Sequence, residues 1–107
     1  DALVGMNAVI MDDAVIGARA IVAACGFVPA GTQVPPAVLV AGVPAKVKRP
    51  LTEQEMAWKH EGTLTYQDLT RRSLASLREV APLAQVEADR PRLQAPDVKP
   101  LIATRRG

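Results

Sequence analysis

The stretch VGMNAVIMDDAVIGARAIVAACGFVPAGTQVPPAVLV, residues 4–40, carries a repeat with a period of six. β-Branched residues stand at every sixth position: Val4, Ile10, Ile16, Val22, Val28, Val34 and Val40. Four places after each of them stand mostly small residues: Ala8, Ala14, Ala20, Gly26, Thr32, Val38 and Pro44. A period of six fits neither an α-helix nor a simple hairpin array, but it is typical of a parallel β-solenoid with one hexapeptide per side.

Three hexapeptides would make one triangular coil, so residues 18 apart should stack in neighbouring coils, about 4.8 Å from each other. The expected ladders are Val4 with Val22 and Val40, Ile10 with Val28, and Ile16 with Val34. Branched side chains lose little rotamer freedom in such a narrow interior. We expect glycine and proline to supply the backbone dihedral angles of the corners.

The array breaks at Lys46, where an inward apolar residue is due. The first predicted region is therefore residues 1–50, with about two coils. Stacked repeats generally need about three units and capped ends, and only Asp1-Ala2-Leu3 precede Val4. We expect further coils upstream of this chain and an open parallel edge that pairs with another strand.

Two capped α-helices are predicted over residues 51–81. Thr52 with Glu55 forms a capping-box pattern, and Gly62 is expected to end this first helix. Thr65 and Asp68 repeat the pattern for a second helix that Pro82 stops. Residues 82–107, with Pro82, Pro91, Pro96 and Pro100, are predicted to be a Pro-rich extended or disordered tail.

Composition excludes several classes of function. The chain has 107 residues, 49% of them hydrophobic, with one Trp, one Tyr, one Phe and a net charge of +2. Aromatic residues are too few for a stacking platform, and basic residues are too scattered to follow a phosphate backbone, so we expect no nucleic acid partner. No apolar run approaches the ~20 residues of a membrane span. A single cysteine, Cys25, excludes an internal disulfide and favours a cytoplasmic location.

Four segments together resemble one family: the hexapeptide array, GVPAKV at 42–47, LTEQEMAWK at 51–59 and TYQDL at 65–69. They resemble the gamma-class carbonic anhydrase-like branch of the left-handed β-helix proteins, and within it the phenylacetate-degradation and carnitine-operon hexapeptide proteins. The resemblance implies a mainly β fold, a left-handed parallel β-helix followed by C-terminal α-helices. The left hand is part of the resemblance, since general rules favour right-handed crossovers.

The resemblance also implies a homotrimer with zinc or a related divalent metal held by three histidines between subunits. Such a site uses a metal-bound water for carbon dioxide hydration or for hydrolysis of an acyl-CoA thioester, here in phenylacetate catabolism. By the family pattern two of the ligands would lie 18 and 13 residues ahead of Met6, and the third further upstream. No metal ligand is therefore expected in this chain, and these residues alone are expected to bind no metal and to be inactive.

Three residues are predicted to line the pocket of such an enzyme: Met6, Asn7 and Tyr66. Met6 and Asn7 would lie one coil away from the first missing histidine and form the floor of the site. Tyr66 would border the site from the second helix, and a packing role for it is about equally expected.

A second set, Lys46, Lys48 and Arg49, resembles the basic corner that approaches the coenzyme A phosphates in hexapeptide acyltransferases. A solvated corner that ends the solenoid is the other interpretation. Two alternative functions follow: a CoA-dependent acyltransferase, or a non-catalytic trimer-forming remnant. Of the remaining candidates, His60 is expected on an exposed helix face, Cys25 as an inert thiol, and Asp12-Asp13 as turn residues.

Overall fold

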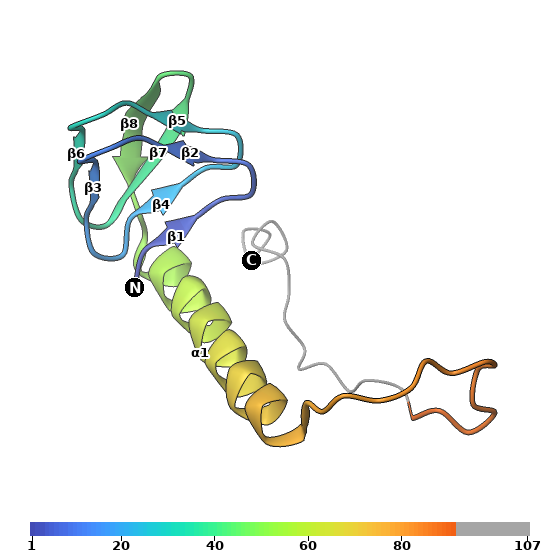
Figure 1. The fold of residues 1–107 in the computed structure, drawn as a ribbon. Helices are drawn as coiled ribbons and strands as arrows, with labels where there is room; N and C mark the ends of the chain where they lie inside the picture. Colours follow the sequence, from blue (N-terminus) through green and yellow to red (C-terminus); the bar gives the residue numbers. More distant parts are fainter. Residues whose placement is uncertain (92–107) are drawn as a thin grey trace. The chain divides into compact units, whose positions relative to one another are not determined.

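A computed structural model describes residues 1–91 and shows eight strands and one helix (Figure 1). The elements are β1 (Leu3–Val4), β2 (Val9–Ile10), β3 (Val15–Ile16), β4 (Ile21–Val22), β5 (Phe27–Val28), β6 (Gln33–Val34), β7 (Val38–Gly42), β8 (Ala45–Pro50) and α1 (Glu53–Ser76). The chain divides into two compact units, residues 1–63 and residues from Leu64 onward. Helix α1 begins in the first unit and continues into the second.

The strands of the first unit pair in parallel, each residue with the residue 18 positions later. Leu3 pairs with Ile21, Val9 with Phe27, and Val15 with Gln33, and β4 continues the first of these stacks onto β7. The three stacks form the three sides of a parallel β-solenoid (Figure 1). We call β1, β2 and β3 the first coil and β4, β5 and β6 the second. The predicted register of 18 is therefore confirmed.

The corners of the solenoid are turns that repeat every six residues. In the first turn the Ala8 N–H donates to the Gly5 carbonyl at 3.1 Å, and the residue before Ala8, Asn7, has a positive φ of 58°. The corner positions with positive φ are Asn7, Asp13, Arg19, Cys25, Gly31 and Ala37. Glycine therefore holds only one of them, contrary to expectation. Hydrogen bonds between coils, such as Cys25 N–H to the Met6 carbonyl at 2.9 Å, hold these left-handed residues in place.

Two glycines of the first coil are required by close approach rather than by a corner. A Cβ atom on Gly5 would lie 2.5 Å from the Ala24 nitrogen, and one on Gly17 would lie 2.4 Å from the Pro36 nitrogen. These are distances to backbone atoms of the second coil, which a side chain cannot displace without moving the strand. The absence of a Cβ here lets the coils stack.

The core is the narrow interior of the solenoid. Its buried members come from the second coil and β7: Ala20, Val22, Val28, Val34 and Val40. Ile10 and Ile16 of the first coil pack against them but are only partly buried. Val4 is 50% exposed although its ladder partner Val22 is fully buried.

The other end of the solenoid is closed by a hairpin that the sequence pattern did not predict. β8 turns back and pairs antiparallel with β7, with Val40 opposite Val47 and Gly42 opposite Ala45. The predicted break of the array at Lys46 therefore coincides with a reversal of chain direction. A cis peptide bond joins Val43 to Pro44 in this turn.

Up to residue 91, one helix and not two follows the solenoid. α1 runs without interruption from Glu53 to Ser76, so Gly62 does not end it and Thr65 does not cap a second helix. A glycine inside a helix is unfavourable by only about 1 kcal/mol, which the turns on either side of it outweigh. The start was predicted correctly, because the Glu55 N–H donates to Thr52 Oγ1 and the Thr52 N–H donates to the Glu55 carboxylate.

Beyond α1 the structure describes residues 77–91 without helix or strand. The helix ends six residues before Pro82, earlier than the predicted residue 81. The predicted tail over 82–107 extends past the described residues, and its part from 92 onward lies outside them. Within the described part of the chain, α1 is not apolar enough to cross a membrane.

Candidate functional site

Met6 and Asn7, the predicted floor of a pocket, form the first corner of the first coil. The Met6 side chain is 82% exposed, and its carbonyl accepts the Cys25 N–H. Asn7 is in the left-handed region, where asparagine is among the best tolerated residues. Asn7 thus has a structural reason to be asparagine, whereas no contact within the described residues explains the exposed methionine.

Tyr66 lies on the part of α1 that belongs to the second unit and is 73% exposed. Its carbonyl accepts the Thr70 hydroxyl at 2.9 Å. Leu69, three residues further along α1, is exposed as well. Leu77, just beyond the end of the helix, is also exposed. The structure therefore presents Tyr66 as part of an uncovered apolar surface.

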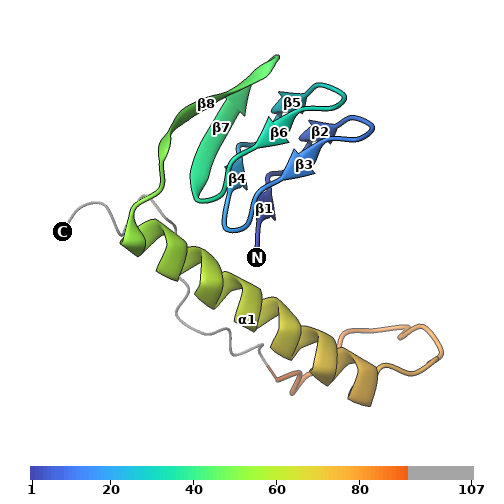
Figure 2. The same ribbon diagram turned by 90° about the vertical axis from the view of Figure 1, so that its left-hand side faces the viewer.

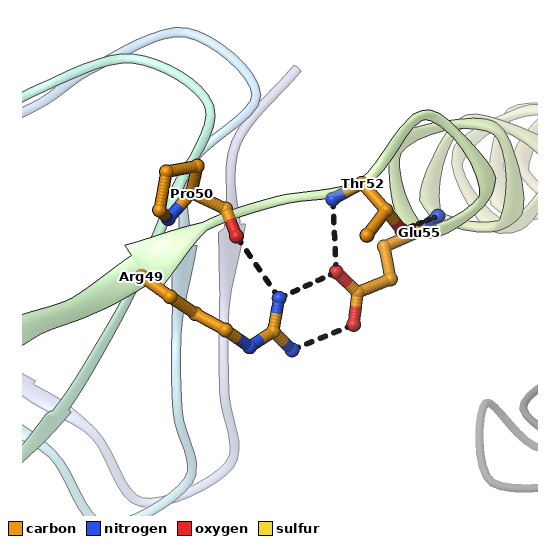
Figure 3. A network of polar contacts seen from close by, with 4 residues as sticks. All are labelled: Arg49, Pro50, Thr52 and Glu55. Atoms are coloured by element: carbon orange, nitrogen blue, oxygen red, sulfur yellow. Dashed lines mark hydrogen bonds and ion pairs between the residues drawn. The ribbon is translucent and has the colours of Figure 1, made fainter.

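The basic corner separates into two kinds of residue. Lys46 and Lys48 are both exposed on β8, two positions apart, at the place where the pairing of β8 with β7 is irregular. Arg49 instead turns to the start of α1, where its guanidinium binds both oxygens of the Glu55 carboxylate at 2.7 Å each (Figure 3). Of the three predicted phosphate-binding candidates, only the two lysines present free charge to an anion.

The Glu55 carboxylate is the centre of a small network at the closed end of the solenoid. It is buried and accepts from Arg49 and from the Thr52 N–H (Figure 3). Arg49 also donates to the Pro50 carbonyl at 3.0 Å. The hydrogen bond to Glu55 raises the pKa of Arg49 above its ordinary value. The network joins the last strand to the first turn of the helix, which indicates a structural role for Arg49.

A second polar cluster was missed by sequence reasoning. The Lys59 Nζ, almost fully buried, donates to Asp1 Oδ1 at 2.6 Å and to Thr63 Oγ1 at 2.9 Å. The other oxygen of Asp1 lies 3.2 Å from His60 Nδ1. Burial lowers the pKa of Lys59. The signal that could have indicated this cluster is the period itself, since Asp1 stands 18 residues before the corner residue Arg19.

The residues present do not fit the metal that the resemblance implies. Among residues 1–91 no three His, Cys, Asp or Glu side chains gather where they could hold a metal ion. His60, on α1, lies beside Asp1. The Cys25 thiol is exposed at a corner, and Asp13 occupies a corner with positive φ. No catalytic step is assigned to a metal on these residues.

Comparison with curated proteins finds close relatives over almost the whole chain. The carnitine operon protein CaiE of Salmonella agona is 54% identical over 104 residues, which cover 96% of this chain and 52% of the relative. CaiE of Escherichia coli K12 is 52% identical over 101 residues, covering 94% of this chain and 52% of the relative. The chain thus spans about half the length of the curated relatives it matches. No protein-family model matches it.

Two solved structures share the fold. A hexapeptide transferase family protein from Anaplasma phagocytophilum is 35% identical with a TM-score of 0.63, covering 66% of this chain and 43% of that protein. A proposed acetyltransferase of Bacillus cereus is 35% identical with a TM-score of 0.58, covering 69% of this chain and 42% of that protein. Together with the observed repeat, these matches show that the chain belongs to the hexapeptide-repeat family that includes the carnitine operon proteins.

Proposed function

We propose that this chain is the closing, C-terminal part of a longer hexapeptide-repeat enzyme that acts on an acyl-CoA thioester. In this proposal the reacting groups lie on coils that stack on the first coil, and the chain supplies the floor and the closed end. The single observation that carries it is the difference between the ends of the solenoid: one is sealed by β8 and α1, and the other exposes the edges of β1, β2 and β3.

Exposure along each ladder supports this assignment of roles. Val4 is half exposed, and Ile10 and Ile16 are only partly buried, although their ladder partners Val22, Val28 and Val34 are buried. Another coil of the same repeat would cover these three positions and satisfy the open strand edges. The relatives are about twice as long as the matched region, which leaves room for such coils.

For the reaction itself we propose hydrolysis of the thioester by a trimeric, metal-dependent enzyme with a left-handed solenoid, in phenylacetate catabolism. Carbon dioxide hydration is the other reaction of this class. The support is the resemblance in the GVPAKV, LTEQEMAWK and TYQDL segments. In this proposal the metal ligands lie outside the described residues, and this chain on its own is non-catalytic.

The test uses the protein with the preceding coils joined to this chain. Phenylacetyl-CoA is supplied, and free thiol is followed over time, with divalent metal measured on the same sample. Thiol release that needs the metal supports hydrolysis. Bicarbonate formation from carbon dioxide without thiol release would show that the reaction is hydration instead of hydrolysis. A protein that contains no metal and is inactive in both assays would overturn the proposal.

A second candidate, CoA-dependent acyl transfer, is favoured by the exposed pair Lys46 and Lys48 and by the names of the two matching structures. Two exposed ammonium groups two positions apart on one strand can neutralise a phosphate. Retention of the protein on immobilised coenzyme A should fall on Lys46→Ala with Lys48→Ala. Arg78→Ala with Arg90→Ala is the matched control, since it also removes two exposed cations. Thiol release only in the presence of an amine or hydroxyl acceptor would select transfer over hydrolysis.

Self-association into a homotrimer is part of the proposal. Its support is the exposed apolar residues Tyr66 and Leu69 on α1, with Leu77 just beyond the end of the helix. Sedimentation should show trimers that Leu69→Asp weakens and that Gln67→Asp, on the other side of the helix, leaves intact. A monomer at all concentrations would contradict this part.

A further inference from the structure

One corner of the solenoid forms a column to which α1 is attached. Arg19 and Ala37 are successive corner residues 18 apart in sequence, both with positive φ, and the Ala37 N–H donates to the Ala18 carbonyl at 2.9 Å. Asp1 lies 18 residues before Arg19 and so occupies the same column one coil earlier. Asp1 and Ala37 are therefore two coil spacings apart, about 9.6 Å.

The first half of α1 runs along this column. Next to the helix start, the Leu51 N–H donates to the Ala37 carbonyl at 2.8 Å, and further on Lys59 reaches Asp1. The six steps along the helix from Glu53 to Lys59 rise about 9 Å, which matches two coil spacings. Figure 2 shows α1 passing from the end with β7 and β8 toward the chain start beside β1.

The contact at the far end is a compact set of charges. The Lys59 side chain is 5% exposed and the Asp1 side chain 35%, so this ion pair is largely shielded from water. Asp1 binds Lys59 with one oxygen and His60 with the other, while Thr63 gives Lys59 a further acceptor. Without the carboxylate, Lys59 would keep a buried ammonium with only a hydroxyl to balance it, which is strongly unfavourable.

We propose that the Asp1 carboxylate is a fastener that holds the open edge strand of the solenoid to α1. β1 has two residues and, among residues 1–91, pairs only with β4. A strand this short is prone to fraying, because few bonds hold it. The fastener keeps β1 in register at the edge where, in the proposed function, the next coil stacks; the inference stands on the charge cluster and does not require that function.

The test is amide hydrogen exchange on the whole chain. The amides of Leu3 and Gly5 donate from the edge strand to Ala20 and Val22, whereas the amide of Ala23 donates between the second coil and β7. Asp1→Asn should speed exchange at Leu3 and Gly5 on the order of tenfold and leave Ala23 unchanged. Asp12→Asn, at an exposed corner, is the control and should change none of the three. Unchanged exchange at Leu3, or equal acceleration at Ala23, would overturn the proposal.

A second variant tests whether Asp1 acts through its contacts with Lys59 and His60 or in another way. With Lys59→Met and His60→Asn in place, the carboxylate has lost both of the side chains that it contacts. Adding Asp1→Asn to that protein should then change Leu3 exchange less than twofold. A tenfold acceleration in this background as well would show that Asp1 acts in some other way, and the proposal would be wrong. The outcome is independent of catalytic activity, so it is distinguishable from failure of the proposed function.

Discussion

The two ends of the solenoid are built from the same repeat but differ in what covers them. At one end β8 pairs with β7, and the network of Arg49, Thr52 and Glu55 joins the sheet to the helix. At the other end, within the described part of the chain, the first coil pairs with the second on one side only, and Val4 is half exposed.

The difference shows that burial in this fold comes from stacking rather than from residue type. Val4, Val22 and Val40 have the same side chain in one ladder, yet only the latter two are buried. Each coil is therefore stabilised mainly by its neighbours, as in other stacked repeats. At the closed end a hairpin and a helix cover the last strands, whereas at the open end no described residue covers the first coil.

The largest effect should come from the contact between the first and second coils. Gly17→Ala places a Cβ 2.4 Å from the Pro36 nitrogen, which should lower the free energy of unfolding by about 3 kcal/mol. Gly31→Ala is the matched control, because a Cβ there meets nothing within 4 Å and only its φ of 70° is unfavourable, at about 1 kcal/mol. Urea unfolding of both variants measures the difference. Equal losses would show that the coils do not approach as described.

The ladder itself gives the next test. Val22→Ala should lower the free energy of unfolding by about 2.5 kcal/mol, because it leaves a cavity in the core. Val4→Ala, in the same ladder at the open end, should lower it by less than about 1 kcal/mol, because half of that side chain already contacts water. Urea midpoints with unchanged slopes are the measurement. A Val4 effect as large as that of Val22 would mean that the first coil is covered.

The closed end should respond to loss of its carboxylate. Glu55→Gln keeps the shape but removes the charge that binds Arg49, and should lower the free energy of unfolding by about 1.5 kcal/mol. The figure is modest because Arg49 is 38% exposed. Glu53→Gln, in the same helical turn, is the control and should stay within about 0.5 kcal/mol. If the two variants unfold alike, the network does not hold this end together.

The smallest expected effect concerns the helix that runs between the ends. Gly62 lies inside α1, and a Cβ there would meet nothing within 4 Å. Gly62→Ala should therefore raise the free energy of unfolding by about 1 kcal/mol and increase helicity in circular dichroism. A loss of stability would favour the predicted pair of helices, with Gly62 as the terminus of the first.

The register and the interior were predictable because both follow from one strong period. A spacing of six fixes which residues face inward, and three hexapeptides per coil fix the offset of 18. The helix start was equally clear, since Thr52 and Glu55 are local in sequence and their reciprocal hydrogen bonds depend on nothing else.

The features that the sequence did not predict share one cause. Contacts with other parts of the chain outweighed the structural preference of the individual residue. Gly62 and Thr65 look like a helix end and a new cap, but their backbone amides are already satisfied within a continuous helix. Cys25 and Ala37 are unusual residues for positive φ, yet hydrogen bonds from the adjacent coil hold them there. The contact of Arg49 with Glu55 was not predicted, because Glu55 belongs to the next element.

The candidate site could be predicted only in part. The corner position of Met6 follows from the period, and the exposure of Lys46 and Lys48 follows from the end of the array. For the cluster of Asp1, Lys59 and His60, the period places Asp1 at a corner but does not indicate its partner, because 58 residues separate Asp1 from Lys59 and the helix rise brings them together.

The 18-residue register can be tested directly with the one native cysteine. Cys25 and Asn7 occupy the same corner in successive coils, both exposed and with nearly equal φ, so their Cα atoms should be about one strand spacing apart, ~4.8 Å. That distance permits a disulfide. On mild oxidation, Asn7→Cys should form an intramolecular disulfide with Cys25, detected by mass spectrometry after alkylation, whereas Asp13→Cys should leave both thiols free. A disulfide in the Asp13→Cys protein but not in the Asn7→Cys protein would contradict the solenoid.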